Sequence, residues 1–235
     1  MEAYFEKSMV LTYAFPKETL IPLLPECLEL DDFKEQYGFM AIAIVQTRDL
    51  RPKGFPSFLG NNFTLIGYRI FVRYRNSQGK RLRGLYILES ETDQKKMEFL
   101  GNIFTKYNYK TTDISIEKKR NQINIQSVAS ELSLQFLQKE SASQLPENSP
   151  FADWKEARRF AGPLPFTFTF DQSKNEVLII EGVRTNWKPE PLEILSEETA
   201  FFKKRNLKDG IPANAFIVEN IPYHWKKGKI ELWIP

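Results

Sequence analysis

The sequence has few of the residues from which most catalytic and metal sites are built. Its 235 residues include one histidine, His224, and one cysteine, Cys27. A single cysteine excludes an internal disulfide framework, and no pair of histidine or cysteine residues has metal-ligand spacing. We interpret His224, which stands between Tyr223 and Trp225, as a packed or solvated side chain and not as a catalytic base. Because a glycine-rich phosphate loop and a nucleophile elbow are also missing, we expect neither a metal nor a cofactor.

The sequence has neither a large excess of positive or negative charge nor a long apolar run. The 33 basic and 30 acidic residues leave a formal net charge of only +3, which is too small for the electrostatic footprint of a nucleic-acid-binding protein. No segment approaches the length of a membrane span. The first 15 residues contain early acids and lack the apolar core of a secretion signal. We therefore expect a cytoplasmic protein that binds neither nucleic acid nor membrane, and the sequence leaves open whether it is a homo-oligomer.

Apolar and aromatic residues are abundant enough for a large core. Hydrophobic residues make up 42% of the chain, and 19 of its residues are phenylalanine, which indicates a globular protein and not a disordered one. The polar stretch 138–150 (QKESASQLPENSP) is the only plausible domain boundary. We interpret it as a surface loop, because neither side clearly has enough strands to close its own sheet. The sequence therefore predicts one domain over residues 1–235.

Alternating apolar and polar residues predict a mainly antiparallel β structure. The expected strands are 9–14, 38–47, 64–75, 81–90, 113–116, 123–126, 132–136, 165–170, 176–183, 215–225 and 229–234, and the expected helices are 93–105, 151–160 and 196–206. We expect the helix after residue 93 to be capped by Thr92 or Asp93 and to bury Met97, Leu100, Gly101 and Phe104.

The hairpin 64–90 contains several arginines, and their charges help to choose its register. A three-residue loop would place Arg73 opposite Arg83 and Arg75 opposite Arg81, and like charges directly opposed destabilise a sheet. We therefore expect the two-residue loop 77–78, with Arg73 opposite Leu82 and Arg69 opposite Tyr86.

This register predicts which side chains share a face of the hairpin. It groups Tyr68, Ile70, Val72, Leu85 and Ile87 in one buried layer, with Glu89 at its end. We expect Glu89 to lie at the rim in water, the alternative being a functionally buried carboxylate. The arginines on the other face are either a solvated surface or a grip for a carboxylate, and the first interpretation is preferred.

Lys95 and Lys96 are the one pair of residues in the sequence that suggests a specific reaction mechanism. A lysine in the first turn of a helix, beside a second ammonium, is disfavoured in its charged form. A neutral lysine attacks ketones and forms a Schiff base. Lys96 lies four residues before Leu100, on the stripe expected to face the core, so it is the better candidate. The alternative interpretation is two surface lysines on a solvated helix end.

Several stretches resemble the acetoacetate-decarboxylase-like superfamily, and specifically its YqjF-like branch. They are LPECLELDDFKEQYGFMAIAIV, FTLIGYRIFVRY and RGLYILESETD, with weaker similarity at FADWKEARRF and near VRTNWKPEPLEI. The resemblance implies an α+β fold, mainly antiparallel β, in which a cone or barrel of strands surrounds a central cavity and a few helices lie outside. It also implies that Lys95 and Lys96 are the counterparts of the adjacent lysines that supply the Schiff base in true decarboxylases.

The same resemblance shows a departure from the decarboxylase pattern. In the family pattern, a glutamate stands four residues before an arginine of this strand. That arginine corresponds to Arg69, so the position of the glutamate is occupied by Leu65. Leucine cannot move a proton, and Glu89 on the neighbouring strand is a candidate to replace the missing carboxylate.

Two hypotheses follow from these patterns. In the first, the protein binds a hydrophobic or weakly acidic small molecule without decarboxylating it, and the ligand-binding candidates are Arg69, Arg73, Tyr68 and Tyr86. In the second, it is a Schiff-base enzyme of the decarboxylase, aldolase or dehydratase type that acts on a small keto acid, and the catalytic candidates are Lys96, Lys95 and Glu89. We rank the first hypothesis ahead because Leu65 replaces the glutamate.

Overall fold

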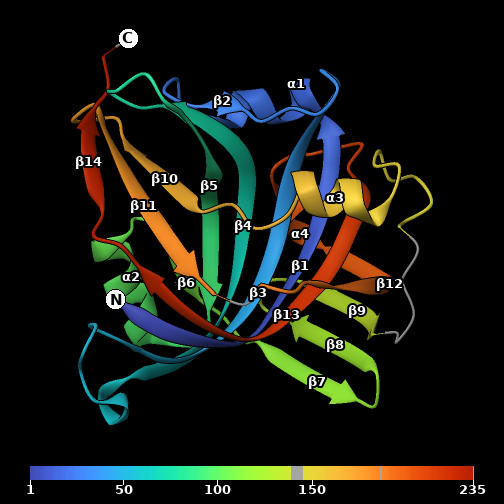
Figure 1. The fold of residues 1–235 in the computed structure, drawn as a ribbon. Coiled ribbons are helices and arrows are strands. Elements are labelled where there is room, and N and C mark those ends of the chain that lie inside the picture. Colours follow the sequence, from blue (N-terminus) through green and yellow to red (C-terminus); the bar gives the residue numbers. More distant parts are fainter. Residues whose placement is uncertain (139–144, 186, 235) are drawn as a thin grey trace.

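The computed structural model describes residues 1–138, 145–185 and 187–234, and strands dominate it (Figure 1). The strands are β1 (Glu2–Pro16), β2 (Glu29–Leu30), β3 (Tyr37–Arg51), β4 (Asn61–Arg75), β5 (Arg81–Thr92), β6 (Tyr109–Thr111), β7 (Ser115–Lys119), β8 (Gln122–Ser127), β9 (Leu132–Gln138), β10 (Phe166–Asp171), β11 (Glu176–Arg184), β12 (Glu190–Thr199), β13 (Ile211–Trp225) and β14 (Lys229–Leu232). The helices are α1 (Lys17–Leu20), α2 (Lys95–Phe104), α3 (Trp154–Phe160) and α4 (Ala200–Lys204), with short 3₁₀ turns η1 (Ile21–Leu23) and η2 (Ser57–Leu59).

Seven strands form a closed ring. Their order is β11-β10-β5-β4-β3-β1-β13, and β13 returns to β11 through pairs such as Gly182 with Trp225. The pairs in this ring are antiparallel except β10 with β5, and β6 also pairs with β5 in parallel. The predicted mainly antiparallel α+β fold is therefore confirmed.

A second group of strands extends the sheet from β13. The meander β7-β8-β9, which the alternating runs predicted, pairs with β12, and β12 pairs with β13. Residues 139–144 of the predicted surface loop 138–150 lie outside the described residues. β9, which ends before them, pairs with β12, which comes later in the chain. No helix in the described ranges is long and apolar enough to cross a membrane.

The helices show where local sequence pattern was a poor guide. The helix expected at 196–206 is only α4, because residues 196–199 pair with β9 as the end of β12. Sheet hydrogen bonding therefore overrides helix propensity there, and Thr199 caps the helix. At α2 the N-cap residue is Gln94 without a side-chain bond. Asp93, an expected cap, instead accepts a hydrogen bond from the Thr64 amide at 2.9 Å.

The ring has two covered faces. On one, which we call the α4 face, Tyr68, Ile70 and Val72 of β4 join a core that includes Phe201 of α4 and Phe136 of β9. On the other, the α3 face, Phe71 packs in a core with Ala157 of α3. Figure 1 shows α3 and the strands β7–β9 on different sides of the sheet. Both faces of β4 are thus buried, which explains why its sequence is so apolar.

The predicted register of the β4–β5 hairpin is wrong. Arg73 lies opposite Arg83 and Arg75 opposite Arg81, the pairing that the like-charge argument rejected. A bulge between Tyr68 and Arg69 then places Tyr68 opposite Glu89 and Arg69 opposite Ile87. As a result, the expected single layer is divided between the two faces. Tyr68, Ile70 and Val72 lie on the α4 face, but Leu85 and Ile87 pack with Phe71 on the α3 face.

A buried aspartate explains why the two arginines can face each other. Asp31, directly after β2, is fully buried, and its carboxylate forms ion pairs of 2.5 Å with the Nε atoms of both Arg73 and Arg83. The neighbouring Glu29 pairs with Arg81 at the surface. Carboxylates from outside the hairpin therefore neutralise Arg73, Arg81 and Arg83, and local pairing rules could not reveal them.

We predict that Asp31→Asn lowers the free energy of unfolding by about 3–5 kcal/mol, because it leaves two opposed guanidiniums without a buried counter-charge. Chemical denaturation measures the loss. Glu29→Gln is the matched control, since it breaks an exposed pair between the same elements and should cost at most about 1 kcal/mol. Equal losses in the two variants would contradict the account of the register.

Candidate functional site

The two candidate Schiff-base lysines lie at the surface. Lys95 and Lys96 are both exposed, and the Lys96 ammonium donates a hydrogen bond to Asn61 Oδ1 at 2.8 Å. Met97 and Gly101 form the buried side of α2, whereas Phe104 is 72% exposed. The expectation that Lys96 faces the core is therefore wrong. The helix packs through a different stripe, in which Gly101 lies against the ring of Tyr109.

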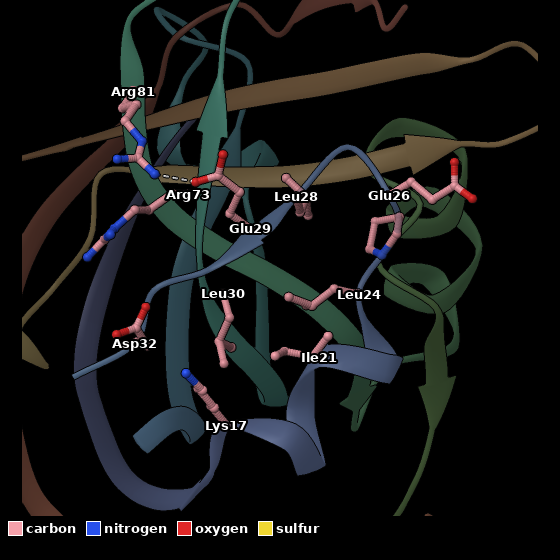
Figure 2. Close-up of a pocket in the computed structure, with 11 residues that line it drawn as sticks. Lys17, Ile21, Leu24, Glu26, Leu28, Glu29, Leu30, Asp32, Arg73 and Arg81 are labelled. Carbon is pink, nitrogen blue, oxygen red and sulfur yellow. Dashed lines mark hydrogen bonds and ion pairs between the residues drawn. The ribbon is translucent and has the colours of Figure 1, made fainter. Parts of the chain in front are cut away.

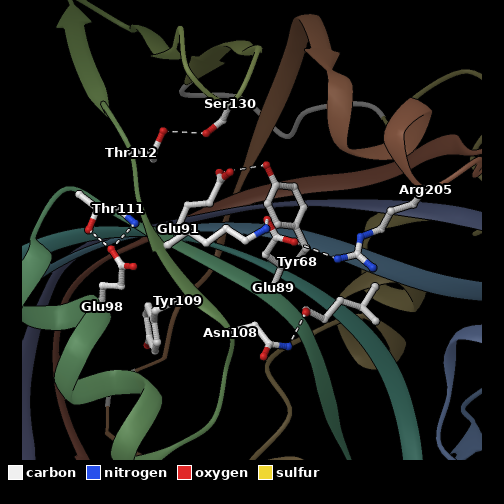
Figure 3. Close-up of polar contacts among 12 residues, drawn as sticks. Tyr68, Glu89, Glu91, Glu98, Asn108, Tyr109, Thr111, Thr112, Ser130 and Arg205 are labelled. Carbon is white, nitrogen blue, oxygen red and sulfur yellow. Dashed lines mark hydrogen bonds and ion pairs between the residues drawn. The ribbon is translucent and has the colours of Figure 1, made fainter.

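Tyr68 and Glu89 lie together on the α4 face (Figure 3). The ring of Tyr68 stacks on Phe201 with 3.7 Å between centroids. Glu89 is neither at a free rim nor unpaired, because it binds Arg205 and Lys110, each at 2.9 Å. These contacts explain both side chains as links between β4, β5 and α4. A catalytic role for Glu89 stays a prediction.

Glu91, which sequence reasoning did not single out, is the buried carboxylate of this face. It accepts a hydrogen bond from the Tyr68 hydroxyl at 3.3 Å and is 8% exposed. Burial raises its pKa above the ordinary range, while hydrogen bonds with Ser130 and Tyr68 partly oppose the shift. Glu91 therefore holds a proton more tightly in the folded chain than in the unfolded one.

Arg73 borders a surface groove of about 440 Å³ (Figure 2). Besides Arg73, the groove is lined by Lys17, Ile21, Leu24, Pro25, Glu26, Leu28, Glu29, Leu30, Asp32 and Arg81. Arg73 is neutralised by Asp31 and Arg81 by Glu29, so the two guanidiniums leave little uncompensated charge to hold an acid.

Tyr86 borders a second groove of about 630 Å³, between β5 and β10. Lys106 lies in the same groove and pairs with Asp171 at 2.5 Å. Tyr86 lies opposite Ile70, so the expected neighbourhood with Arg69 is wrong. The structure thus separates the four ligand-binding candidates, and the roles of Tyr86 and Tyr68 in binding stay predictions.

Arg69 differs from every other candidate because it lies on the α3 face without a counter-charge. Its Nε is buried and has no hydrogen-bond partner, although part of the side chain remains accessible. Burial lowers the pKa of Arg69, and the groups that oppose this shift are the phenols of Tyr109, Tyr223 and Tyr107. No carboxylate in the described ranges pairs with it. We call Arg69 and these three tyrosines the Arg69 cluster.

Small residues make room for the Arg69 cluster. A β-carbon at Gly67 would come within 2.8 Å of Arg69 Nε. Ala41 and Ala43 lie opposite Arg69 and Gly67 on β3. On β11, a β-carbon at Gly182 would overlap the Tyr223 hydroxyl. Two glycines on separate strands thus leave space for polar side chains on the α3 face.

The three phenols come from two parts of the chain that lie far apart in sequence. Tyr107 precedes β6, Tyr109 begins it, and Tyr223 lies near the end of β13, stacked on Phe5 at 4.4 Å between centroids. The Tyr107 hydroxyl bonds the Thr167 hydroxyl of β10 at 2.5 Å. Burial raises the pKa values of all three tyrosines, so they remain neutral hydrogen-bonding groups near pH 7.

The same face carries further polar atoms without partners. Arg69, Ala41, Thr12 and Asn214 form one row across β4, β3, β1 and β13. Thr12 Oγ1 and both amide atoms of Asn214 are buried and have no hydrogen-bond partner. Buried polar groups normally have partners, so three such side chains in one row call for an explanation, and a bound ligand is one. The α3 face around Arg69 is therefore the candidate site.

The chemistry available at this site is recognition of an anion. Guanidinium groups bind carboxylates through paired N–H donors, and neutral phenols add further donors. Within the described residues, no group of three histidine, cysteine, aspartate or glutamate side chains could hold a metal ion. The alternation of β4 could assign Arg69 to one face, but the tyrosines could not be found from local pattern, because only the ring brings β6, β13 and β4 together.

Removing the charge of Glu91 and of Glu89, both on β5, should change the free energy of unfolding in opposite directions. Glu91→Gln imitates the protonated carboxyl, so we expect it to raise the free energy of unfolding at pH 7. In the wild type, the stability that protonated Glu91 contributes is complete below its unfolded pKa of about 4.3 and is lost as pH rises through its raised folded pKa. The free energy of unfolding therefore falls over this pH range. In Glu91→Gln this fall should be smaller, because the side chain cannot ionise. Denaturant titrations from pH 4 to 8 measure both effects.

Glu89→Gln is the matched control two residues away. It loses ion pairs to Arg205 and Lys110 and should be destabilised by about 1 kcal/mol at pH 7. A Glu91→Gln protein that is less stable than wild type at pH 7 would show that the Glu91 carboxylate is satisfied in its charged form.

Comparisons with solved structures agree with the fold described above. The structure matches acetoacetate decarboxylase from Legionella pneumophila subsp. pneumophila str. Philadelphia 1 with a TM-score of 0.63 and 11% identity, covering 98% of this chain and 86% of that one. It matches an acetoacetate decarboxylase-like enzyme from Sphingomonas wittichii RW1 with a TM-score of 0.60 and 9% identity, over 97% and 89% of the chains. The enduracididine biosynthesis enzyme MppR, complexed with pyruvate, matches with a TM-score of 0.60 and 7% identity, over 98% and 90%.

These similarities show an acetoacetate-decarboxylase-like fold, as the sequence resemblance implied, and at such low identity they show the fold alone. No curated protein matches the chain. The model of the family DUF2071, described as "Uncharacterized conserved protein (COG2071)", matches residues 2–225. The chain belongs to the DUF2071 family.

Proposed function

We propose that this protein binds a small acidic molecule on the α3 face of its strand ring, with Arg69 as the anchor for a carboxylate. The observation that carries the proposal is Arg69 itself: its buried Nε has no hydrogen-bond partner, and no described carboxylate neutralises its charge. An isolated buried charge is costly, and proteins normally pair it. A bound carboxylate would supply the missing partner.

Arg73 gives an internal comparison for this argument. It lies four residues after Arg69 on the same strand and the same face, and Asp31 neutralises it at 2.5 Å. The chain therefore supplies a carboxylate where an arginine holds the fold together. Arg69 has three neutral phenols instead, and these can donate hydrogen bonds to an acid without competing for the guanidinium.

The Schiff-base alternative has less support. Lys95 and Lys96 lie in water, and none of the lysines that the structure describes is buried. Leu65, where the family pattern has a glutamate, packs with Val45, Phe63 and Met97 in an apolar cluster. A carboxylate and a desolvated amine are the groups that such chemistry needs, so we prefer binding without decarboxylation.

A solved neighbour supports acid binding by this fold. MppR is described as complexed with pyruvate, a small keto acid. Its 7% identity carries no residue over to this chain, so the support is limited to what the fold can accommodate.

Arg69→Gln should weaken the binding of small acids. We expect isothermal titration calorimetry with acetate, pyruvate, butyrate and benzoate to find at least one ligand of the wild-type protein. The variant should bind that ligand about 10- to 100-fold more weakly, because it loses a charge-assisted pair. Arg159→Gln, which changes an exposed arginine of α3, is the control and should bind as wild type does. Failure of every acid to bind, or equal binding by Arg69→Gln, would refute the proposal.

Borohydride trapping separates binding from Schiff-base chemistry. With pyruvate and borohydride, we expect mass spectrometry to find Lys95 and Lys96 labelled no more than the exposed Lys53, because neither amine is desolvated. Selective labelling of Lys96, lost in Lys96→Arg, would instead establish the enzyme hypothesis.

A further inference from the structure

A second cation lies beside the Arg69 cluster. Arg184, the last residue of β11, pairs across the strands with Tyr223 of β13 at the junction that closes the ring. Its Nη2 donates a hydrogen bond to the Pro163 carbonyl at 2.7 Å, and its guanidinium lies 4.9 Å from the centroid of the Trp187 ring. These contacts hold the guanidinium in place and leave its charge without a carboxylate.

Tyr223 connects the two guanidiniums. Its phenol is a hydrogen-bond partner of Arg184 and also feels the charge of Arg69. Both arginines keep part of their surface accessible.

The charge balance of this region is the decisive point. Among the described residues, the buried acids are Asp31, Glu91 and Glu231, and each has other partners. Asp31 binds Arg73 and Arg83, Glu91 binds Tyr68, and Glu231 binds Tyr74 and Lys229. Arg69 and Arg184 therefore leave two positive charges on one side of the ring, and a monocarboxylate would neutralise only one of them.

We propose that the ligand is a small dicarboxylate, with one carboxylate on Arg69, the other on Arg184, and the Tyr223 phenol between them. This inference rests on the proposed function, because it assumes that Arg69 binds an acid. It adds that the preferred acid has two anionic groups joined by a short spacer. Planar guanidiniums suit this task, since each can hold one carboxylate through two N–H donors.

Matched acids of equal chain length test the inference by calorimetry at low ionic strength. The probes are malonate, succinate, glutarate and adipate, each paired with the monocarboxylate of the same carbon number. We expect one diacid to bind at least about tenfold more tightly than its monoacid partner, as a second charge-assisted pair predicts. In Arg184→Gln the diacid affinity should fall to that of the monoacid. In Arg69→Gln both acids should bind about 10- to 100-fold more weakly, and Arg159→Gln should behave as wild type.

The ratio of diacid to monoacid affinity distinguishes a binding role from a structural one. The role of Arg184 could be purely structural, through its hydrogen bond to the Pro163 carbonyl. Arg184→Gln would then change the diacid and monoacid affinities alike, and their ratio would persist. That result overturns the inference. Equal binding of diacids and monoacids by the wild type also overturns it but leaves the proposed function intact. Saturation by inorganic phosphate with the same dependence on Arg184 would show that the guanidiniums share one anion, contrary to the inference. If no acid binds at all, the proposed function falls as well.

Discussion

The buried carboxylate of Asp31 is the interaction on which the β4–β5 hairpin depends. Two arginines directly opposed on adjacent strands repel each other, and a sheet normally avoids that register. Asp31 reverses the sign of the effect by forming 2.5 Å ion pairs with both Arg73 and Arg83 from a fully buried position. Arg83 also donates to the Phe160 carbonyl at 2.9 Å, so the same cluster ties the end of α3 to the hairpin.

The hairpin in turn divides the side chains of two long strands between two cores. With Arg73 opposite Arg83 and a bulge after Tyr68, Leu85 joins the α3 face and Glu91 the α4 face. On the α4 face the buried Glu91 has hydroxyl partners in Tyr68 and Ser130, which partly oppose the rise in its pKa caused by burial. The α3 face has no such balance, because Arg69 remains charged and unpaired beside neutral phenols. An imbalance of this kind costs stability, and functional sites are where proteins tolerate it.

Sequence patterns predicted the elements of the fold well and its charge pairs poorly. Alternation located most strands, the meander 113–136 and the helix at 151–160, because these signals are local. The hairpin register was wrong because the decisive residue, Asp31, lies about 40 residues before Arg73 in sequence. Helix propensity failed at 196–199 because pairing with β9 decided the structure there.

The candidate site was predictable only in part for the same reason. Arg69 was identified from β4 and from the family resemblance. The partners Tyr107, Tyr109, Tyr223 and Arg184 reach it only when the ring closes between β11 and β13. Lys96 was misplaced because an apolar stripe fixes a helix face only if the surrounding chain buries that stripe, and Phe104 shows that it does not.

A crystal structure determined with pyruvate would test the central claim most directly, because it shows where an acid binds and what it replaces. The account predicts the pyruvate carboxylate on the α3 face, with its oxygens about 2.7–2.9 Å from the Arg69 guanidinium. It would be contradicted by an Arg69 that is paired with a carboxylate of its own chain, or by pyruvate bound only at Lys96 on the surface.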